Sequence, residues 1–234
     1  GSGDEALDLV TRTIVTPPSG EGAAVYSYRL TRALGDSELA GFEESWDIEI
    51  TAEGDPENGY AETEDFIEDV MDGGFADCRI WKSWRYPANS TDGNAEYAGR
   101  LKKTVAPDGR TSIYSYDYSN GRTTVETGLA DSGGDIEEGA KTVTTVNETG
   151  RTTQQESYER KRENNDWVLT SLVKYGDFDE YGRPETATYW FGEEAEDELD
   201  DPGTGDETFI TTTTFTCCKT DEFTGRDGVT TDYD

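Results

Sequence analysis

Residues 105–118 read Val-Ala-Pro-Asp-Gly-Arg-Thr-Ser-Ile-Tyr-Ser-Tyr-Asp-Tyr. The Pro-Asp-Gly run favours a tight turn, because proline and aspartate are turn residues and glycine accepts a positive φ. The residues that follow are rich in Thr, Ile and Tyr, and in an extended strand Tyr114, Tyr116 and Tyr118 fall on one face. This stretch therefore predicts a turn that leads into a β-strand with an aromatic row.

A Gly-Arg pair, usually preceded by an acidic or amide residue, recurs beyond this stretch. Its further copies are Gly99-Arg100, Gly121-Arg122, Gly150-Arg151, Gly182-Arg183 and Gly225-Arg226, and Asp117, Asp179 and Asp221 are leading acids. Each position has a physical role in a hairpin turn: the Asp or Asn side chain binds the turn backbone, the glycine supplies a positive φ, and the arginine begins the returning strand. The pattern predicts repeated hairpin turns whose arginines bridge carboxylates on neighbouring strands.

Strand-like runs rich in Thr, Val, Ile and aromatic residues dominate the chain. They occupy residues 10–16, 24–32, 46–51, 78–86, 111–118, 141–146, 167–175, 184–191 and 208–217. One segment differs, because Phe66, Ile67, Val70 and Met71 have helical spacing and are followed by a Gly-Gly stop. The sequence thus predicts an all-β fold of antiparallel hairpins in an extended or spiralling sheet, with at most one short helix near residues 63–72.

The Pro-Asp-Gly-Arg and Tyr-Asp sequences of residues 105–118, and Phe-Asp-Glu-Tyr-Gly-Arg at residues 178–183, resemble the repeat unit of the RHS/YD-repeat family. The resemblance covers residues 96–234, whereas residues 1–95 match poorly. It implies a YD-repeat-like array of β-hairpins over residues 96–234, preceded by an irregular β region with the short helix. In that family successive hairpins build a long sheet that spirals into a hollow shell.

The charge and the composition exclude several classes of function. The formal net charge is −32, which argues against binding to nucleic acid or to an anionic membrane surface through charge. No apolar run reaches the ~20 residues of a membrane-spanning helix, so we expect no membrane insertion. The chain has no histidine, which removes His-based triads, bases and metal ligands and favours a non-enzymatic protein.

Three further groups of residues carry binding or cross-linking hypotheses. Cys78 can form a disulfide with Cys217 or Cys218, or all three can be reduced thiols. The acidic stretches 131–139 and 193–206 are predicted exposed loops and are candidate sites for Ca²⁺ or other cations, although neither has the ligand spacing of a calcium loop and solvated surface charge is the simpler interpretation. No cofactor is otherwise indicated.

Aromatic residues in the strands are candidates for stacking on sugar rings. These candidates are Trp81, Trp84, Tyr86 and Trp190. Ordinary core packing is the competing interpretation, because large aromatic side chains of strands are commonly buried.

These observations lead to three hypotheses about function. The first is a secreted or cell-surface structural protein, a component of a surface fibre that self-associates by stacking of β-sheet edges or continues into a longer repeat protein. The end of the chain within repeat-like sequence at residues 227–234 favours such a longer parent. The second is a segment of an RHS-type toxin-encapsulating or adhesion shell. The third is an adhesive module that binds glycans.

Overall fold

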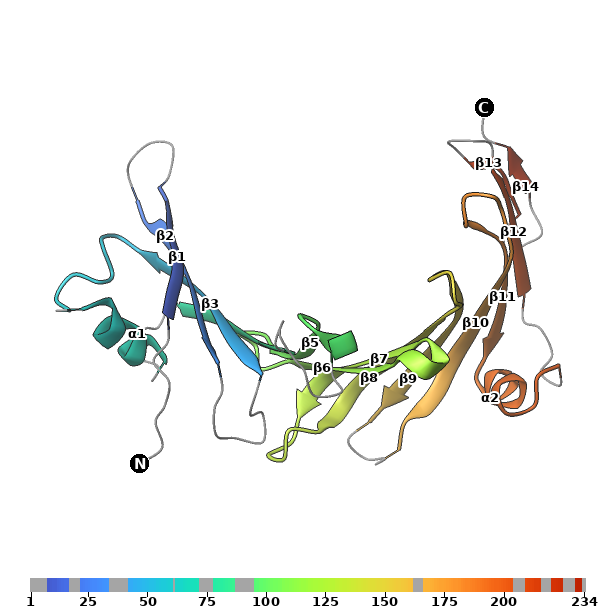
Figure 1. Cartoon of the computed structure of the whole chain (residues 1–234), viewed down its shortest axis with the longest axis horizontal. Coiled ribbons are helices and arrows are strands. Elements are labelled where there is room, and N and C mark those ends of the chain that lie inside the picture. Colours follow the sequence, from blue (N-terminus) through green and yellow to red (C-terminus); the bar gives the residue numbers. More distant parts are fainter. Residues whose placement is uncertain are drawn as a thin grey trace. The chain divides into compact units, whose positions relative to one another are not determined.

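The computed structural model describes residues 8–16, 22–33, 42–60, 62–71, 78–86, 95–161, 166–203, 209–215, 220–224 and 230–232. The chain forms two compact units, Gly1–Ser112 and Ile113–Asp234. In both units the strands are antiparallel, and neighbours in the sheet are neighbours in the sequence (Figure 1). The prediction of an antiparallel β protein is confirmed.

The first unit contains a sheet with a short helix on one face. Its elements are β1 (Asp8–Val15), β2 (Ala24–Ala33), β3 (Glu43–Ala52), α1 (Thr63–Met71), β4 (Cys78–Arg85), a 3₁₀ turn (Ala95–Tyr97) and β5 (Leu101–Val105). The pairs β1–β2, β2–β3, β3–β4 and β4–β5 all run antiparallel. The helix expected from the spacing of apolar residues is confirmed at Thr63–Met71.

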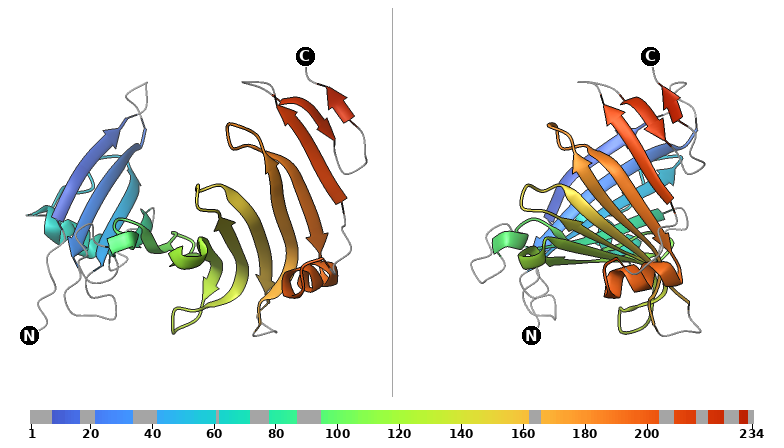
Figure 2. Two further views of the ribbon diagram at one scale, coloured as in Figure 1. Left: turned by 45° about the vertical axis from the view of Figure 1, so that its right-hand side comes forward. Right: turned by 90° about the vertical axis from the view of Figure 1, so that its right-hand side faces the viewer.

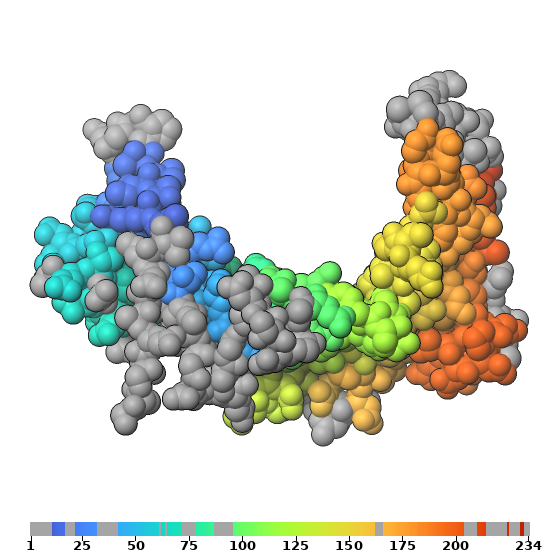
Figure 3. Space-filling view, in the orientation of Figure 1, coloured from blue at the N-terminus to red at the C-terminus, as the bar shows by residue number. Residues whose placement is uncertain are grey.

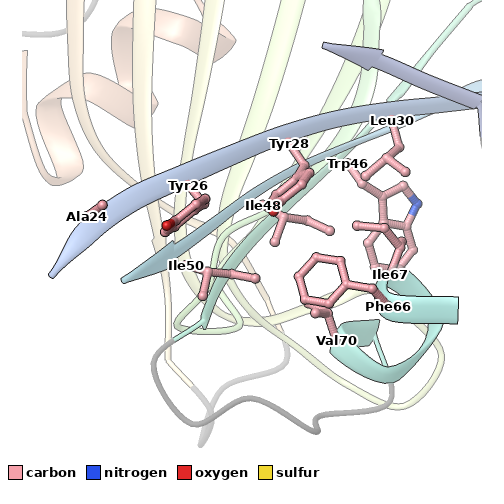
Figure 4. Close-up of a cluster of buried hydrophobic side chains, with 10 residues drawn as sticks. All are labelled: Ala24, Tyr26, Tyr28, Leu30, Trp46, Ile48, Ile50, Phe66, Ile67 and Val70. Atoms are coloured by element: carbon pink, nitrogen blue, oxygen red, sulfur yellow. The ribbon is translucent and has the colours of Figure 1, made fainter. Parts of the chain in front are cut away.

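The core of this unit lies between α1 and the sheet (Figure 4). Every second residue of β2 and β3 points to it, as the period of a strand requires. The buried side chains are Tyr26, Tyr28 and Leu30 from β2, Trp46, Ile48 and Ile50 from β3, and Phe66, Ile67 and Val70 from α1. Phe66 is fully buried, and its ring centroid lies 5.4 Å from those of Tyr28 and Tyr60. The residues that alternate with these along β2 and β3 consequently lie on the opposite face of the sheet.

The second unit begins within β6 (Thr111–Asp117) and adds strands one after another. The elements that follow are a 3₁₀ turn (Tyr118–Asn120), β7 (Arg122–Ala130), β8 (Ile136–Val146), β9 (Thr152–Arg160), β10 (Val168–Phe178), β11 (Pro184–Phe191), α2 (Glu193–Asp200), β12 (Phe209–Phe215), β13 (Thr220–Thr224) and β14 (Thr230–Asp232). Helix α2 lies at one end of β10 and β11 (Figure 2).

Helix α2 corrects two predictions. The sequence allowed one helix at most and placed an exposed loop at 193–206, but residues Glu193–Asp200 are helical. Ala195 and Leu199, one turn apart, pack with Leu169, Leu172 and Trp190, which gives the helix an apolar side. Acidic residues in its first turn also complement the helix dipole. In Figure 3 the dark orange surface of α2 is continuous with that of the strands above it.

The other predicted acidic loop, 131–139, is also shorter than expected. Residues 131–135 form a turn, but β8 begins at Ile136, which is only 1% exposed. Ile136 pairs with Ala130 of β7, so the strand pairing extends into the acidic stretch. Burial of the Ile136 side chain favours this longer strand. Among the described residues, no helix is long and apolar enough to cross a membrane.

Candidate functional site

Four hairpin turns share one backbone geometry, and we call them the hairpin tips. They comprise residues 106–110, 131–135, 147–151 and 179–183. In each, the first residue's N–H donates to the carbonyl of the fifth at 2.8–3.0 Å, and the fourth residue's N–H donates to the carbonyl of the first at 2.9–3.1 Å. The fourth residue is always a glycine with φ between +79° and +92°. This is a type I turn followed by a left-handed glycine, a common three-residue hairpin loop.

The first side chain of the tip fastens the loop in three of these copies. Asp179 Oδ1 accepts the N–H groups of Tyr181 at 3.0 Å and Arg183 at 2.8 Å. Asn147 Oδ1 accepts those of Thr149 and Arg151, both at 3.0 Å. Asp131 does the same in the tip 131–135, which has no Gly-Arg pair and was missed as a repeat for that reason.

The remaining Gly-Arg pairs lie in other settings. Asp117 caps the 3₁₀ turn Tyr118–Asn120, and Gly121 ends it with φ +63°. Gly99, with φ +72°, donates its N–H to the Tyr86 carbonyl at 2.8 Å, next to Arg100. Asp221 lies in β13, whereas Gly225 and Arg226 fall outside the described residues.

The arginines of these pairs have different partners. Arg183 binds the carboxylate of its own tip, with both Nε and Nη2 2.7 Å from Asp179 Oδ2. Arg110 also faces its own turn, 3.7 Å from Asp108, and both side chains are well exposed. Arg122 reaches across strands, to Glu156. The expectation of cross-strand bridging therefore describes Arg122, while Arg110 and Arg183 stabilise their own turns.

Consecutive turns on one side of the second unit contact one another. The Gly121 carbonyl accepts the N–H of Val146 at 2.9 Å, which joins the turn before β7 to the tip 147–151. The guanidinium of Arg151 lies 5.7 Å from the centroid of the Phe178 ring. A Cβ added to Gly182 would lie 2.7 Å from Arg151 Nε, so the arginine rests directly on the next tip. Of these three turns, at residues 118–121, 147–151 and 179–183, each of the first two therefore contacts the next one along the chain.

Glu156 in β9 is the centre of a buried polar network. Its carboxylate is 1% exposed and accepts hydrogen bonds from Arg122 Nη2 at 3.1 and 3.2 Å, Gln154 Nε2 at 3.0 Å and the Tyr158 hydroxyl at 2.5 Å. Burial and the neighbouring carboxylate raise the pKa of Tyr158. A buried carboxylate is tolerated only when it is paired and hydrogen-bonded, as here. The network joins β7 to β9 across β8.

A lysine and two aromatic rings adjoin this network. Lys141 Nζ lies 4.0 Å from the centroid of Tyr158 and 5.2 Å from that of Trp167, and burial lowers the pKa of this lysine. Lys174, farther along the same sheet, pairs with the buried Glu198 of α2, which also accepts the Gly203 N–H at 2.7 Å. In the sequence, the alternation of Gln154, Glu156 and Tyr158 could have indicated three polar side chains on one face of a strand. It could not have indicated that Arg122 binds Glu156, because that contact depends on the register of the strands.

The structure places the four sugar-stacking candidates in different environments. Trp84 and Trp190 are buried, 9% and 5% exposed, and Tyr86 packs with Phe42 and Tyr97 at centroid distances of 4.9 and 5.2 Å. Trp81 is half-buried and lines a groove in the first unit.

The cysteine and cation hypotheses stay predictions. Cys78 is a half-buried free thiol whose pKa burial raises, and Cys217 and Cys218 lie outside the part of the chain that the structure describes. Within the described residues, no group of three or more Cys, Asp or Glu side chains is arranged to hold a metal ion. No protein-family model and no curated protein matches this sequence.

Proposed function

We propose that this chain is a non-enzymatic structural protein, a component of an extracellular repeat assembly built from YD-repeat-type hairpins. The observation that supports it most is the fit between consecutive turns, in which the Arg151 guanidinium rests on Phe178 and Gly182 of the next tip. Contacts between neighbouring turns are one way in which repeat proteins gain stability from neighbour to neighbour. The resemblance to RHS/YD repeats adds the extracellular setting to this proposal.

Self-association through a sheet edge is the second part of the proposal. Among the described residues β1 pairs on one side only, with β2, and its side chains from Thr11 to Val15 are exposed. Ile14 and Val15 are 48% and 59% exposed and sit in an eight-residue strand without proline. A long exposed edge of this kind is suited to pairing with another strand. The partner is a second copy, or a neighbouring strand of a longer parent protein.

Electron microscopy of the purified chain, at high protein concentration with NaCl or CaCl₂, tests this proposal. We expect ordered filaments or stacked oligomers, and we expect Ile14→Lys to abolish them by placing a charge on the edge strand. Phe191→Lys is the matched control, because Phe191 is similarly exposed at 42% but lies in the interior strand β11. Monomeric particles under every condition would count against self-assembly, and assembly that survives Ile14→Lys would exclude the β1 edge as its route.

A further inference from the structure

One face of the first unit bears a groove of about 690 Å³ on the side of the sheet opposite α1. The register places four of its residues directly opposite one another on successive strands: Thr11 in β1, Arg29 in β2, Asp47 in β3 and Trp81 in β4. Four adjacent strands span about 14 Å, at roughly 4.8 Å per strand. The row therefore forms an extended surface that combines hydroxyl, guanidinium, carboxylate and indole groups.

Trp81 differs from the other tryptophans of the chain. The chain has five, and a lysine ammonium lies over the ring of each of the other four, at 3.8 Å for Trp46, 5.6 Å for Trp84, 5.2 Å for Trp167 and 5.2 Å for Trp190. Within the described residues, no cation or aromatic ring lies over Trp81. Its indole is half-buried in the wall of the groove, so the ring is held in place and leaves an aromatic surface for a ligand.

The polar groups beside Trp81 are accessible and nearly balanced in charge. Arg29 Nε lies 3.7 Å from Asp47 Oδ1, and the two side chains are 49% and 50% exposed. The lining has three cationic side chains, Arg29, Lys82 and Arg85, and two carboxylates, Asp47 and Glu49, although the whole chain carries −32. The overall negative charge disfavours a polyanionic ligand, and the small excess of cationic side chains in the lining gives a cation no particular attraction. A neutral ligand rich in hydrogen-bonding groups fits these conditions.

We infer that this groove is a binding site for a neutral oligosaccharide, with Trp81 as the stacking surface and Arg29 and Asp47 as the hydrogen-bonding pair beside it. A sugar ring has an apolar C–H face and a polar rim, so it needs an aromatic surface flanked by donors and acceptors. Hydroxyls of Thr11, Thr13 and Ser27 extend the polar lining along the groove. Such a mixture of one aromatic group and a few convergent polar groups is typical of ligand sites. This inference does not depend on filament formation.

The test is binding of the full chain to a panel of linear hexasaccharides, measured by calorimetry and by tryptophan fluorescence. The panel contains neutral β-glucan, chitin, mannan and xylan fragments, a sulfated and a uronic-acid oligosaccharide, and a lysine-rich peptide. We expect at least one neutral sugar to bind and Trp81→Ala to weaken binding about ten-fold or more. Tyr181→Ala is the matched control, because it removes a 61% exposed aromatic residue from a hairpin tip of the other unit and should leave the affinity unchanged.

Two conservative variants keep the test decisive if Trp81→Ala does not fold. Trp81→Phe retains a smaller ring and should retain part of the affinity, and Asp47→Asn should weaken binding without a change in melting temperature. The inference is overturned if no neutral sugar binds at about 5 mM, if only the anionic sugars or the peptide bind, or if the folded Trp81 variants bind as well as the unchanged chain.

Discussion

Arg122 and Glu156 lie in strands that β8 separates, yet Nη2 of the arginine is 3.1 and 3.2 Å from the two carboxylate oxygens. The glutamate is almost fully buried, whereas the arginine side chain is 45% exposed. The pair therefore neutralises a carboxylate inside the sheet while its cation remains in partial contact with water. The Arg122 side chain thus links β7 to β9 across the intervening strand β8.

Arg122→Ala should lower the free energy of unfolding of the second unit by about 2 kcal/mol. The value lies below that of a fully buried pair because Arg122 is partly exposed and because Gln154 and Tyr158 still donate to Glu156. Urea denaturation provides the measurement. Arg110→Ala is the control, since Arg110 and Asp108 are exposed and 3.7 Å apart. Equal effects of the two substitutions would show that the buried pair has no special role.

Gly182→Ala should destabilise the chain more than Gly109→Ala does. Both glycines have φ +82°, so alanine at either position costs about 1–2 kcal/mol of backbone strain. At Gly109 the added Cβ meets nothing within 4 Å, but at Gly182 it must displace Arg151 from the Phe178 ring. The expected difference is about 0.5–1 kcal/mol, measured by thermal or urea denaturation.

The Arg151→Ala background separates this contact from backbone strain. If Arg151 is the cause, Gly182→Ala and Gly109→Ala should have equal effects once Arg151 is absent. A difference that persists in this background would mean that the turns are not coupled through Arg151.

The hairpin tips could be predicted from the sequence because their geometry depends on five consecutive residues. The left-handed glycine at position 182 and the aspartate at position 179 fix that turn without reference to the rest of the chain. Partners such as Glu156, 34 residues after Arg122, depend on the register of two successive hairpins and so on the length of each turn. Sequence patterns do not supply that register.

Helix α2 was missed for a different reason. Its eight residues are dominated by Glu and Asp, and this composition hid Ala195 and Leu199, which lie one turn apart and reach the core. The position of Trp81 likewise follows from which face of the sheet α1 covers. Strand alternation shows that Trp81 and Trp84 point to opposite faces, but it does not show which of them faces the helix.

Asp179→Asn should give a loss of stability that depends on pH. Burial acts to raise the pKa of Asp179, but the hydrogen bonds and the charge of Arg183 outweigh it and hold the pKa below its ordinary value of 3.8. Because the folded pKa lies below the unfolded one, the stabilisation is complete above about pH 3.8 and is lost as the pH falls through the folded value. The variant should therefore have a lower free energy of unfolding than the unchanged chain at neutral pH. This difference in the free energy of unfolding should disappear at acidic pH.

Urea titrations from pH 7 to about pH 2.5 provide the comparison, since both proteins share every other titrating group. The reciprocal substitution Asn147→Asp, at the same position of the preceding tip, should introduce an acid-dependent loss over the same range of pH. Parallel stability curves for Asp179→Asn and the unchanged chain would show that the ionised carboxylate is not the stabilising form.

Salt should stabilise the chain and leave the Arg122–Glu156 contribution nearly unchanged. With a net charge of −32, exposed carboxylates repel one another, and raising NaCl from about 0.05 to about 1 M shortens the screening length to about 3 Å. The melting temperature should rise. Glu156 is only 1% exposed, so solvent ions reach the pair from the side of Arg122 alone, and the cost of Arg122→Ala should change little between the two salt concentrations. A cost that disappears at high salt would mean that solvent screens this pair, and a melting temperature that does not rise would mean that repulsion between carboxylates does not limit stability.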